Sequence, residues 1–426
     1  MRRLLKKIPA GALQFSILIS IVIASIVMAF ILLTYTQIRF SKQLSFAEKT
    51  IELTHSGIAF EKQNAIPYGD SISPDIALDY GTLKLHKAHW GSFDKLIVTS
   101  QIRKNKHQKI ALMGGVYSDK TRPAIYLSDR NMPLVLVGKT QIKGASWLPR
   151  QGVKGGNIVG NYYQGSQLIY GPIMESKSLL PKIPMDKRLY FKELLFGDLP
   201  QVDSLFISPR GKELVKNSFD SEPKWIYSKG VITLTDMELE GNIIVKSDTL
   251  IRVSAFAKAK DILLVAPHII IDSEVEGAFQ AVASKSITVG IGARLKYPSS
   301  LVVIRDNKNI IEGRKSKEFI GIRIEERSRV AGVVMYLGDS TTKHQKPTLE
   351  IDKDVEIRGD VYVEGGVELK GRVLGSVYAN NFSAQERGSI YQNHIFNGEV
   401  DASGLPKRFA GLFTASHSKE VVKWLD

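Results

Sequence analysis

The stretch LEIDKD VEIRGD VYVEGG VELKGR VLGSVY, from Leu349 to Tyr378, repeats every six residues. An aliphatic residue opens each unit, and in the first four units a second one follows two places later. Gly359, Gly365 and Gly371 take the fifth place of the middle three units. Side chains at i and i+2 lie on one face of a strand, so both aliphatic residues of a unit point into the same core.

Short inward faces separated by turns predict a β-solenoid. Glycine tolerates the positive φ that tight turns require, and charged residues suit a solvated corner. Three short faces make one coil, and stacked coils bury an aliphatic column that no single coil could bury. The alternative is an antiparallel meander, which would need hairpin turns and longer strands.

Looser forms of this pattern occur earlier in the chain. Residues 237–255, 261–279 and 284–295 read as brief strands with turns between them, and residues 133–160 alternate aliphatic pairs with glycines. The polar stretch 305–318 reads as an inserted loop.

These patterns predict four consecutive parts of the body. They are a first β-solenoid part over 121–180, a partly helical insertion or linker over 181–225, the main β-solenoid over 226–405, and a C-terminal cap helix over 406–426. The cap is expected because KEVVKWLD is amphipathic and an open sheet edge has to be covered.

The N-terminal region contains a membrane-spanning segment. No charged side chain occurs between Lys7 and Arg39. A bilayer core requires about 20 apolar residues of helix, and a single segment that crosses lipid must be helical. A transmembrane helix is therefore predicted over 12–38. A cleaved signal peptide is the alternative, but the apolar run is longer than the core of such a peptide, and no small-residue cleavage pattern follows it.

The flanking charges predict the orientation of this helix. Arg2, Arg3, Lys6 and Lys7 lie on its N-terminal side. The positive-inside rule then leaves a cytoplasmic tail over 1–11 and places the body in the periplasm or outside the cell. The predicted location is the inner (cytoplasmic) membrane.

A small membrane-proximal unit, β or α+β, is predicted over 39–120. In it, residues 92–104 and 107–117 read as a hairpin. The predicted fold class is thus mainly β, with a single N-terminal transmembrane helix, this unit, and then a β-solenoid with an insertion.

The composition excludes several classes of function. Hydrophobic content of 43% and charged content of 24% are those of a folded protein. The absence of cysteine excludes disulfides, thiolate catalysis and cysteine-ligated metals. The net charge of +15 suggests anionic neighbours such as lipid headgroups or acidic glycans. Nucleic acid is not expected, because the basic residues form no stripe with interleaved aromatic residues.

The sequence carries no recognisable catalytic, cofactor-binding or metal-binding motif. His86 and His89 would point to opposite faces of a strand and read as surface residues. A carbohydrate-active β-helix enzyme would need clustered carboxylates. The carboxylates of the repeat read instead as a solvated, charge-balanced surface; they are Asp352, Asp354, Asp360, Glu364 and Glu368.

One aromatic group is a candidate binding surface. Trp147, Tyr162, Tyr163 and Tyr170 occur in a glycine-rich stretch, and rings of this kind stack on sugars. This group is predicted to contact a glycan or a partner protein. The alternative is that its rings cover solenoid loops.

Two parts of the chain resemble known families. Residues 354–379, DVEIRGDVYVEGGVELKGRVLGSVYA, resemble the core of bactofilins and related polymer-forming β-helix proteins, which implies end-to-end polymerisation. MRRLLKKIPAG followed by ALQFSILISIVIA resembles a type IV prepilin, which implies processing after Gly11. Ser16 stands where that family normally has an acidic residue.

Three functions follow from these patterns. The leading prediction is a non-enzymatic, membrane-anchored envelope protein that acts as a scaffold or as an assembly or adhesion subunit. Its expected partners are the lipid bilayer through residues 12–38, other copies or another envelope protein, and an anionic glycan. The alternatives are a pilin-like minor subunit of a type IV pilus or secretion machine, and a carbohydrate-active β-helix enzyme.

Overall fold

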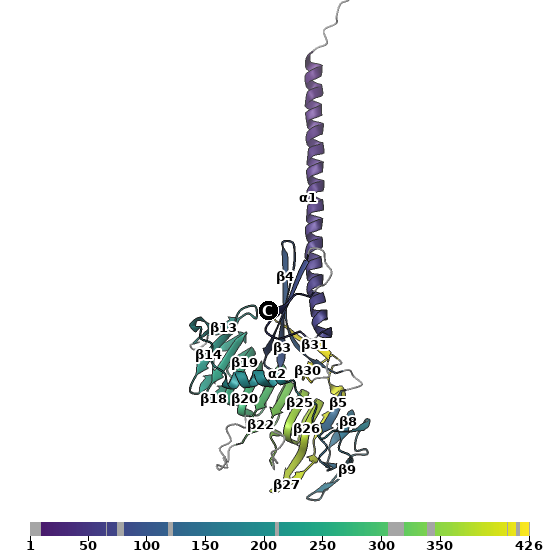
Figure 1. Ribbon diagram of the computed structural model, residues 1–426, viewed down its shortest axis with the longest axis vertical. Coiled ribbons are helices and arrows are strands. Elements are labelled where there is room, and N and C mark those ends of the chain that lie inside the picture. Colours follow the sequence, from purple (N-terminus) through teal and green to yellow (C-terminus); the bar gives the residue numbers. More distant parts are fainter. Residues whose placement is uncertain are drawn as a thin grey trace, which may run out of the picture. The chain divides into compact units, whose positions relative to one another are not determined.

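A computed structural model describes residues 10–64, 66–74, 81–117, 122–208, 213–305, 319–338, 346–406, 408–414 and 418–425. The predicted cytoplasmic tail lies outside these residues except for its last two positions, and the predicted inserted loop does so except for Arg305. The protein is mainly β with one long apolar N-terminal helix, as predicted (Figure 1).

The chain divides into two compact units. Unit 1 comprises residues 1–59, 72–85 and 98–108, and unit 2 comprises residues 60–71, 86–97 and 109–426.

Helix α1 (Ala10–Gln63) is a single uninterrupted helix (Figure 1). It contains the predicted transmembrane segment but continues well beyond residue 38, so the region predicted as β or α+β over 39–120 begins with helix. The missed signal is a set of residues three and four positions apart, which lie on one helical face. These residues are Thr50, Leu53, Thr54, Gly57 and Ile58.

An antiparallel sheet follows α1. Its neighbouring strands are β1 (Ser71–Ile72), β2 (Gly81–Trp90), β3 (Phe93–Ile102) and β4 (Asn105–Val116). The predicted hairpin is confirmed as β3 and β4, with its turn at Arg103 and Lys104.

The C-terminus returns to the same sheet. Strands β30 (Ala410–Gly411) and β31 (Ser418–Leu425) both pair antiparallel with β4. The cap helix predicted over 406–426 is therefore wrong. A segment as short as KEVVKWL fits both helical and strand periodicity, and the available partner strand decides between them.

The remaining strands form mainly parallel pairs. Twenty of them make a closed sheet. Their bounds are β5 (Pro123–Leu127), β7 (Gln141–Lys143), β8 (Ala145–Leu148), β12 (Ile173–Glu175), β13 (Leu214–Asn217), β14 (Lys224–Ser228), β15 (Ile232–Leu234), β16 (Glu238–Gly241), β17 (Ile243–Ser247), β18 (Leu250–Val253), β19 (Lys258–Ile271), β20 (Glu276–Val289), β21 (Arg294–Ile304), β22 (Gly321–Ile324), β23 (Arg329–Leu337), β24 (Leu349–Ile351), β25 (Glu356–Leu369), β26 (Arg372–Glu386), β27 (Ser389–Gln392) and β29 (Glu399–Asp401).

Five further strands and three short helical segments complete the body. The strands β6 (Leu134–Val137), β9 (Val153–Gly155) and β28 (His394–Phe396) form one small sheet, and β10 (Asn157–Ile158) and β11 (Asn161–Tyr162) form a hairpin. Helix α2 (Met185–Phe196) lies in the insertion that was predicted to be partly helical, and η1 (Asp203–Leu205) and η3 (Ala402–Gly404) are single 3-10 turns.

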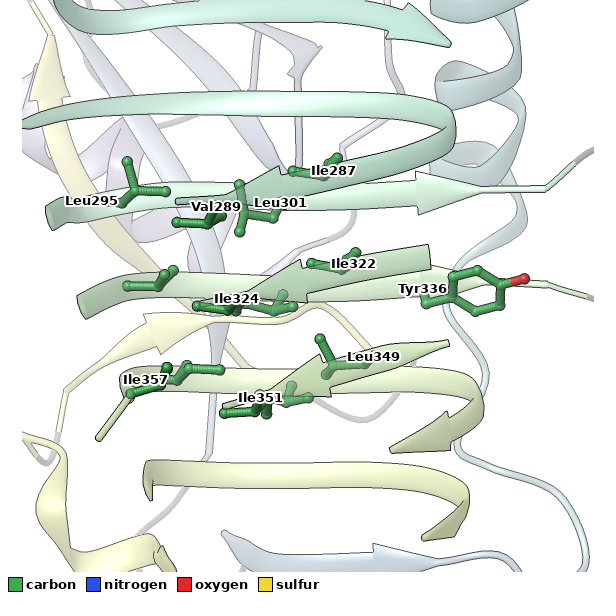
Figure 2. Close-up of a cluster of buried hydrophobic side chains, with 14 of the residues drawn as sticks. Ile287, Val289, Leu295, Leu301, Ile322, Ile324, Tyr336, Leu349, Ile351 and Ile357 are labelled. Atoms are coloured by element: carbon green, nitrogen blue, oxygen red, sulfur yellow. The ribbon is translucent and has the colours of Figure 1, made fainter. Parts of the chain in front are cut away.

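The parallel pairs bring equivalent side chains into register. The inward column that results is Ala259, Gly277, Leu295, Val330, Ile357, Val373, Val400 and Ile142, each paired with the next. Figure 2 shows aliphatic side chains from successive layers of strands, such as Val289, Ile324 and Ile351, in one continuous core. The paired aliphatic residues of the first four hexads are all buried in this core.

The order of the strands differs from the order predicted. The segment 121–180 was predicted as the first part of the solenoid, but β5 pairs with β26 and β7 pairs with β29. It therefore lies beside the last strands of the main body. The parallel pairs also begin at β13, inside the region predicted as an insertion over 181–225. The six-residue repeat identifies which segments form strands, but it does not specify which strands pair with one another.

Candidate functional site

The first half of α1 exposes its apolar side chains. From Leu13 to Leu44 its large apolar residues are each about half exposed or more. The hydroxyls of Ser20, Ser25 and Thr34 donate to backbone carbonyls of the preceding turn, each at 2.8 Å. These three hydroxyls are thus satisfied within the helix, as a lipid environment requires. Among the described residues, α1 is the one helix long and apolar enough to cross a membrane.

A later segment of α1 packs on the strands of unit 1. Thr54 Oγ1 lies 2.7 Å from Ser100 Oγ, and Ser100 Oγ donates to the carbonyl of Thr50 at 2.7 Å. A Cβ atom at Gly57 would lie 2.7 Å from Val98 Cγ1, so the absence of a side chain there permits close packing. Helix and strands of unit 1 therefore form one packed element.

Unit 2 contains five charged side chains in alternating order, which we call the charge network. They are Lys419, Glu61, Lys87, Asp94 and Lys187. Glu61 Oε1 lies 2.7 Å from Lys419 Nζ and 3.2 Å from Lys87 Nζ. Lys87 Nζ lies 3.3 Å from Asp94 Oδ2, and Lys187 Nζ lies 2.6 Å from Asp94 Oδ1.

Four members of the charge network are almost completely buried. Glu61 is 0% exposed, Asp94 1%, Lys187 2% and Lys87 4%. Burial lowers the pKa of Lys187, and the neighbouring Asp94 opposes this change. Burial by itself would raise the pKa of Asp94, but Lys187, His89 and Lys87 hold it below the ordinary value. Charges this deeply buried require partners, because an unpaired one is strongly destabilising.

A histidine between two tyrosine rings lies against the charge network. The centroid of the His89 ring is 3.8 Å from that of Tyr68 and 4.7 Å from that of Tyr190. His89 Nδ1 lies 3.4 Å from Asp94 Oδ1 and is buried without a hydrogen-bond partner. The prediction that His89 is a surface residue is wrong.

Three further predictions about charged residues need correction. Asp360, predicted as part of a solvated surface, is fully buried and pairs with Arg122 at 2.8 Å. Its second oxygen accepts the backbone N–H of Leu412 at 3.1 Å. Glu364 is half-buried and pairs with Arg188. Glu368 is buried and pairs with Lys370 at 3.0 Å. The hexad pattern indicates which positions face outward, but not which outward positions other segments cover.

The four aromatic residues predicted to form one binding surface have different surroundings in the structure. Trp147 stacks with Tyr126, with ring centroids 6.4 Å apart. Tyr163 packs against the core cluster, and Tyr170 Oη lies 3.0 Å from Ser166 Oγ. Tyr162 is 68% exposed. No ring contact among the described residues joins Trp147 to the three tyrosines, so the four do not form one cluster. A glycan or partner contact at these residues stays a prediction.

No motif in the sequence predicts the charge network. Glu61, Lys87, Asp94, Lys187 and Lys419 are distributed over most of the chain and belong to no motif. Only the tertiary fold brings them together. In the described part of the chain, no group of three or more His, Asp or Glu side chains is arranged to hold a metal ion.

The comparisons with known proteins do not assign the chain to a family. No family model matches the chain, and no curated protein matches it. One similar solved structure is the competence-associated pilin ComZ from Thermus thermophilus, at 11% identity, covering 90% of this chain and 97% of that one with a TM-score of 0.21. A TM-score this low does not establish a common fold.

Proposed function

We propose that the chain is a pilin-like subunit of a membrane-associated assembly and that it has no enzymatic activity. The observation that carries this proposal is α1, one helix whose first half is apolar and exposed and whose later part packs on the strands of its own unit. Such a helix supplies both a membrane anchor and a firm attachment to a folded head. The proposed location is the inner membrane, with the N-terminus in the cytoplasm.

The N-terminal sequence supports the same proposal. Gly11 precedes the apolar helix after a basic leader, in the arrangement of type IV prepilins. Ser16 departs from that family's pattern. We therefore propose a minor subunit, since minor pilin-like subunits tolerate this departure.

An apolar stripe on α1 gives the proposal a physical basis. Leu33, Phe40, Leu44 and Ile51 are exposed, and a 100° rotation per residue places them within one narrow sector of the helix. The middle of this sector lies about 100° from Thr50 and about 120° from Gly57 of the packed face, whereas Ile58, near the end of the helix, lies within the sector. Three of the four residues follow the predicted membrane segment, where lipid alone does not explain their exposure. We propose that the stripe contacts the corresponding helix of another subunit.

The body is proposed to be a β-solenoid. The inward column supports this, and so does a recurring left-handed corner two residues before a strand begins. Glu274, Gly292, Arg327 and Asp354 have φ values of 58°, 72°, 61° and 61°, and they precede β20, β21, β23 and β25. A repeated corner at equivalent positions is expected when each coil has the same path.

Cross-linking tests the proposed stripe directly. Because the chain has no cysteine, Leu44→Cys introduces a single thiol in the stripe, and Lys49→Cys introduces one on the opposite side of α1. In membranes we expect a bifunctional thiol reagent to link Leu44→Cys into a dimer and to leave Lys49→Cys mainly monomeric. Equal cross-linking of the two variants, or none of either, would contradict assembly through this stripe.

A second candidate function is an envelope scaffold, and the stacked parallel strands favour it. In that case the body lacking residues 1–39 would form filaments in solution through its strand edges. Electron microscopy of the purified body separates the two functions, because a pilin-like subunit is expected to need the membrane-spanning part of α1 for assembly, which this body lacks.

A further inference from the structure

The contact between Lys187 and Asp94 joins two distant parts of unit 2. Lys187 lies in α2 and Asp94 lies in β3, and the atoms Nζ and Oδ1 are 2.6 Å apart. Lys187 Nζ also donates to the carbonyl of Phe93 at 2.9 Å. Both side chains are excluded from solvent.

The two oxygens of Asp94 have different surroundings. Oδ2 accepts the hydroxyl of Tyr68 at 2.8 Å and lies 3.3 Å from Lys87 Nζ. Oδ1 faces Lys187 Nζ and lies 3.4 Å from the unpartnered Nδ1 of His89. One oxygen is thus held by two donors, and the other lies between an amine and an imidazole.

We propose that Lys187 and Asp94 condense to form an intramolecular isopeptide bond. A bond forms between Lys187 Nζ and Asp94 Cγ, and the bond between Cγ and Oδ1 breaks. Oδ1 leaves as water with two protons from the lysine ammonium group. No atom is oxidised or reduced, and no co-reactant is needed.

The surrounding groups supply the chemistry for this step. A proton shift from Nζ to Oδ1 along their hydrogen bond gives the amine and the carboxylic acid, the reactive forms. Attack on Cγ places negative charge on Oδ2, where Lys87 and Tyr68 stabilise it, as donors do in an oxyanion hole. His89 Nδ1 is placed to pass the remaining proton to the departing oxygen. Because hydrolysis of an amide buried at this position is slow, the product accumulates even from a small population of the neutral pair.

The net charge of the charge network does not change when the bond forms. Lys187 and Asp94 lose their opposite charges together, and Lys87 keeps Glu61 as its partner at 3.2 Å. The new amide N–H retains the carbonyl of Phe93 as an acceptor. Replacing a buried ion pair by a neutral group removes a desolvation penalty. The product fixes α2 covalently to β3.

Mass spectrometry of the full-length protein tests the bond. We expect the folded wild type to be lighter than its sequence mass by one water molecule. Digestion should yield a branched peptide in which Lys187 and Asp94 are joined. Lys187→Arg keeps the positive charge but should have the full sequence mass. Lys182→Arg, a matched exposed change on the same segment, should retain the mass deficit.

These measurements also define the results that would overturn the bond. A folded wild type at full sequence mass contradicts it, whether or not the variants fold. A mass deficit that persists in Lys187→Arg assigns the lost water elsewhere and contradicts it equally. N-terminal processing shifts the masses of all three proteins alike, so it does not affect the comparison.

Discussion

The aliphatic column and the charge network are both buried, but they depend on different physical effects. The column consists of many similar side chains, and each contributes by the apolar area that it removes from water. The charge network has five members, and each is stabilised by particular neighbours. A change in the column that preserves size and polarity should be tolerated, whereas a missing charge leaves its partner buried and unpaired. Substitutions in the column, in the charge network and at the surface test this difference.

Placing charges in the column should have the largest effect. Val361→Asp combined with Val363→Asp buries two carboxylates without partners, and each costs several kcal/mol. We expect the C-terminal strands to lose their folded structure, measured by circular dichroism and by limited proteolysis.

The matched control for the column is Arg358→Ala, an exposed position in the same strand β25. It should change stability by less than about 0.5 kcal/mol. A double aspartate variant with the wild-type melting profile would show that these two valines are not core residues.

Removing one charge from the charge network should have the next largest effect. Glu61→Ala leaves Lys87 and Lys419 without their shared carboxylate, and breaking a buried pair typically destabilises by about 3–5 kcal/mol. Urea denaturation of the detergent-solubilised protein measures the loss.

Glu350→Ala is the matched control for this change, since Glu350 pairs with Arg323 at the surface. An exposed pair is worth about 0–1 kcal/mol. Equal losses of unfolding free energy in Glu61→Ala and Glu350→Ala would mean that the buried network stabilises the protein no more than a surface ion pair does.

An exposed ion pair should give the smallest effect, and one that depends on pH. Hydrogen bonds from Lys216 and Lys260 lower the pKa of Glu240 to about 2. The unfolded value is about 4.3, so the contribution is present above that pH and disappears as the pH falls from about 4 to 2. Because Glu240 is near the surface, we expect less than about 1 kcal/mol.

Glu240→Gln should remove this acid-dependent contribution while leaving the stability below pH 2 unchanged. Thermal melts of the variant and the wild type at pH 7 and pH 3 provide the comparison. A difference that grows toward acid pH would contradict the direction of the pKa shift.

The column was predictable from sequence because its aliphatic residues recur every few positions along the chain. The paired aliphatic residues from Leu349 onward report the inward face directly, and the structure buries them as expected. Strand order was not predictable, since β26 and β5 are distant in sequence and meet through their edges. The end of α1 was missed because its packed face includes Thr50, Thr54 and Gly57, which a search for apolar residues overlooks.

The charge network was not predictable for a different reason. A lysine such as Lys187 has the same sequence signature whether it is solvated or buried against Asp94. Its burial depends on which segment covers it, and that is decided by the whole fold. The same applies to Asp360, whose partner Arg122 lies in a different part of the chain.

The proposal of a pilin-like subunit is tested most directly by the N-terminus of the protein recovered from membranes. Intact-mass measurement and N-terminal sequencing should find a chain that begins at Ala12, with the leader removed after Gly11. A mature chain that begins at Met1 would contradict prepilin-type processing and would leave the anchored scaffold as the better description of this protein.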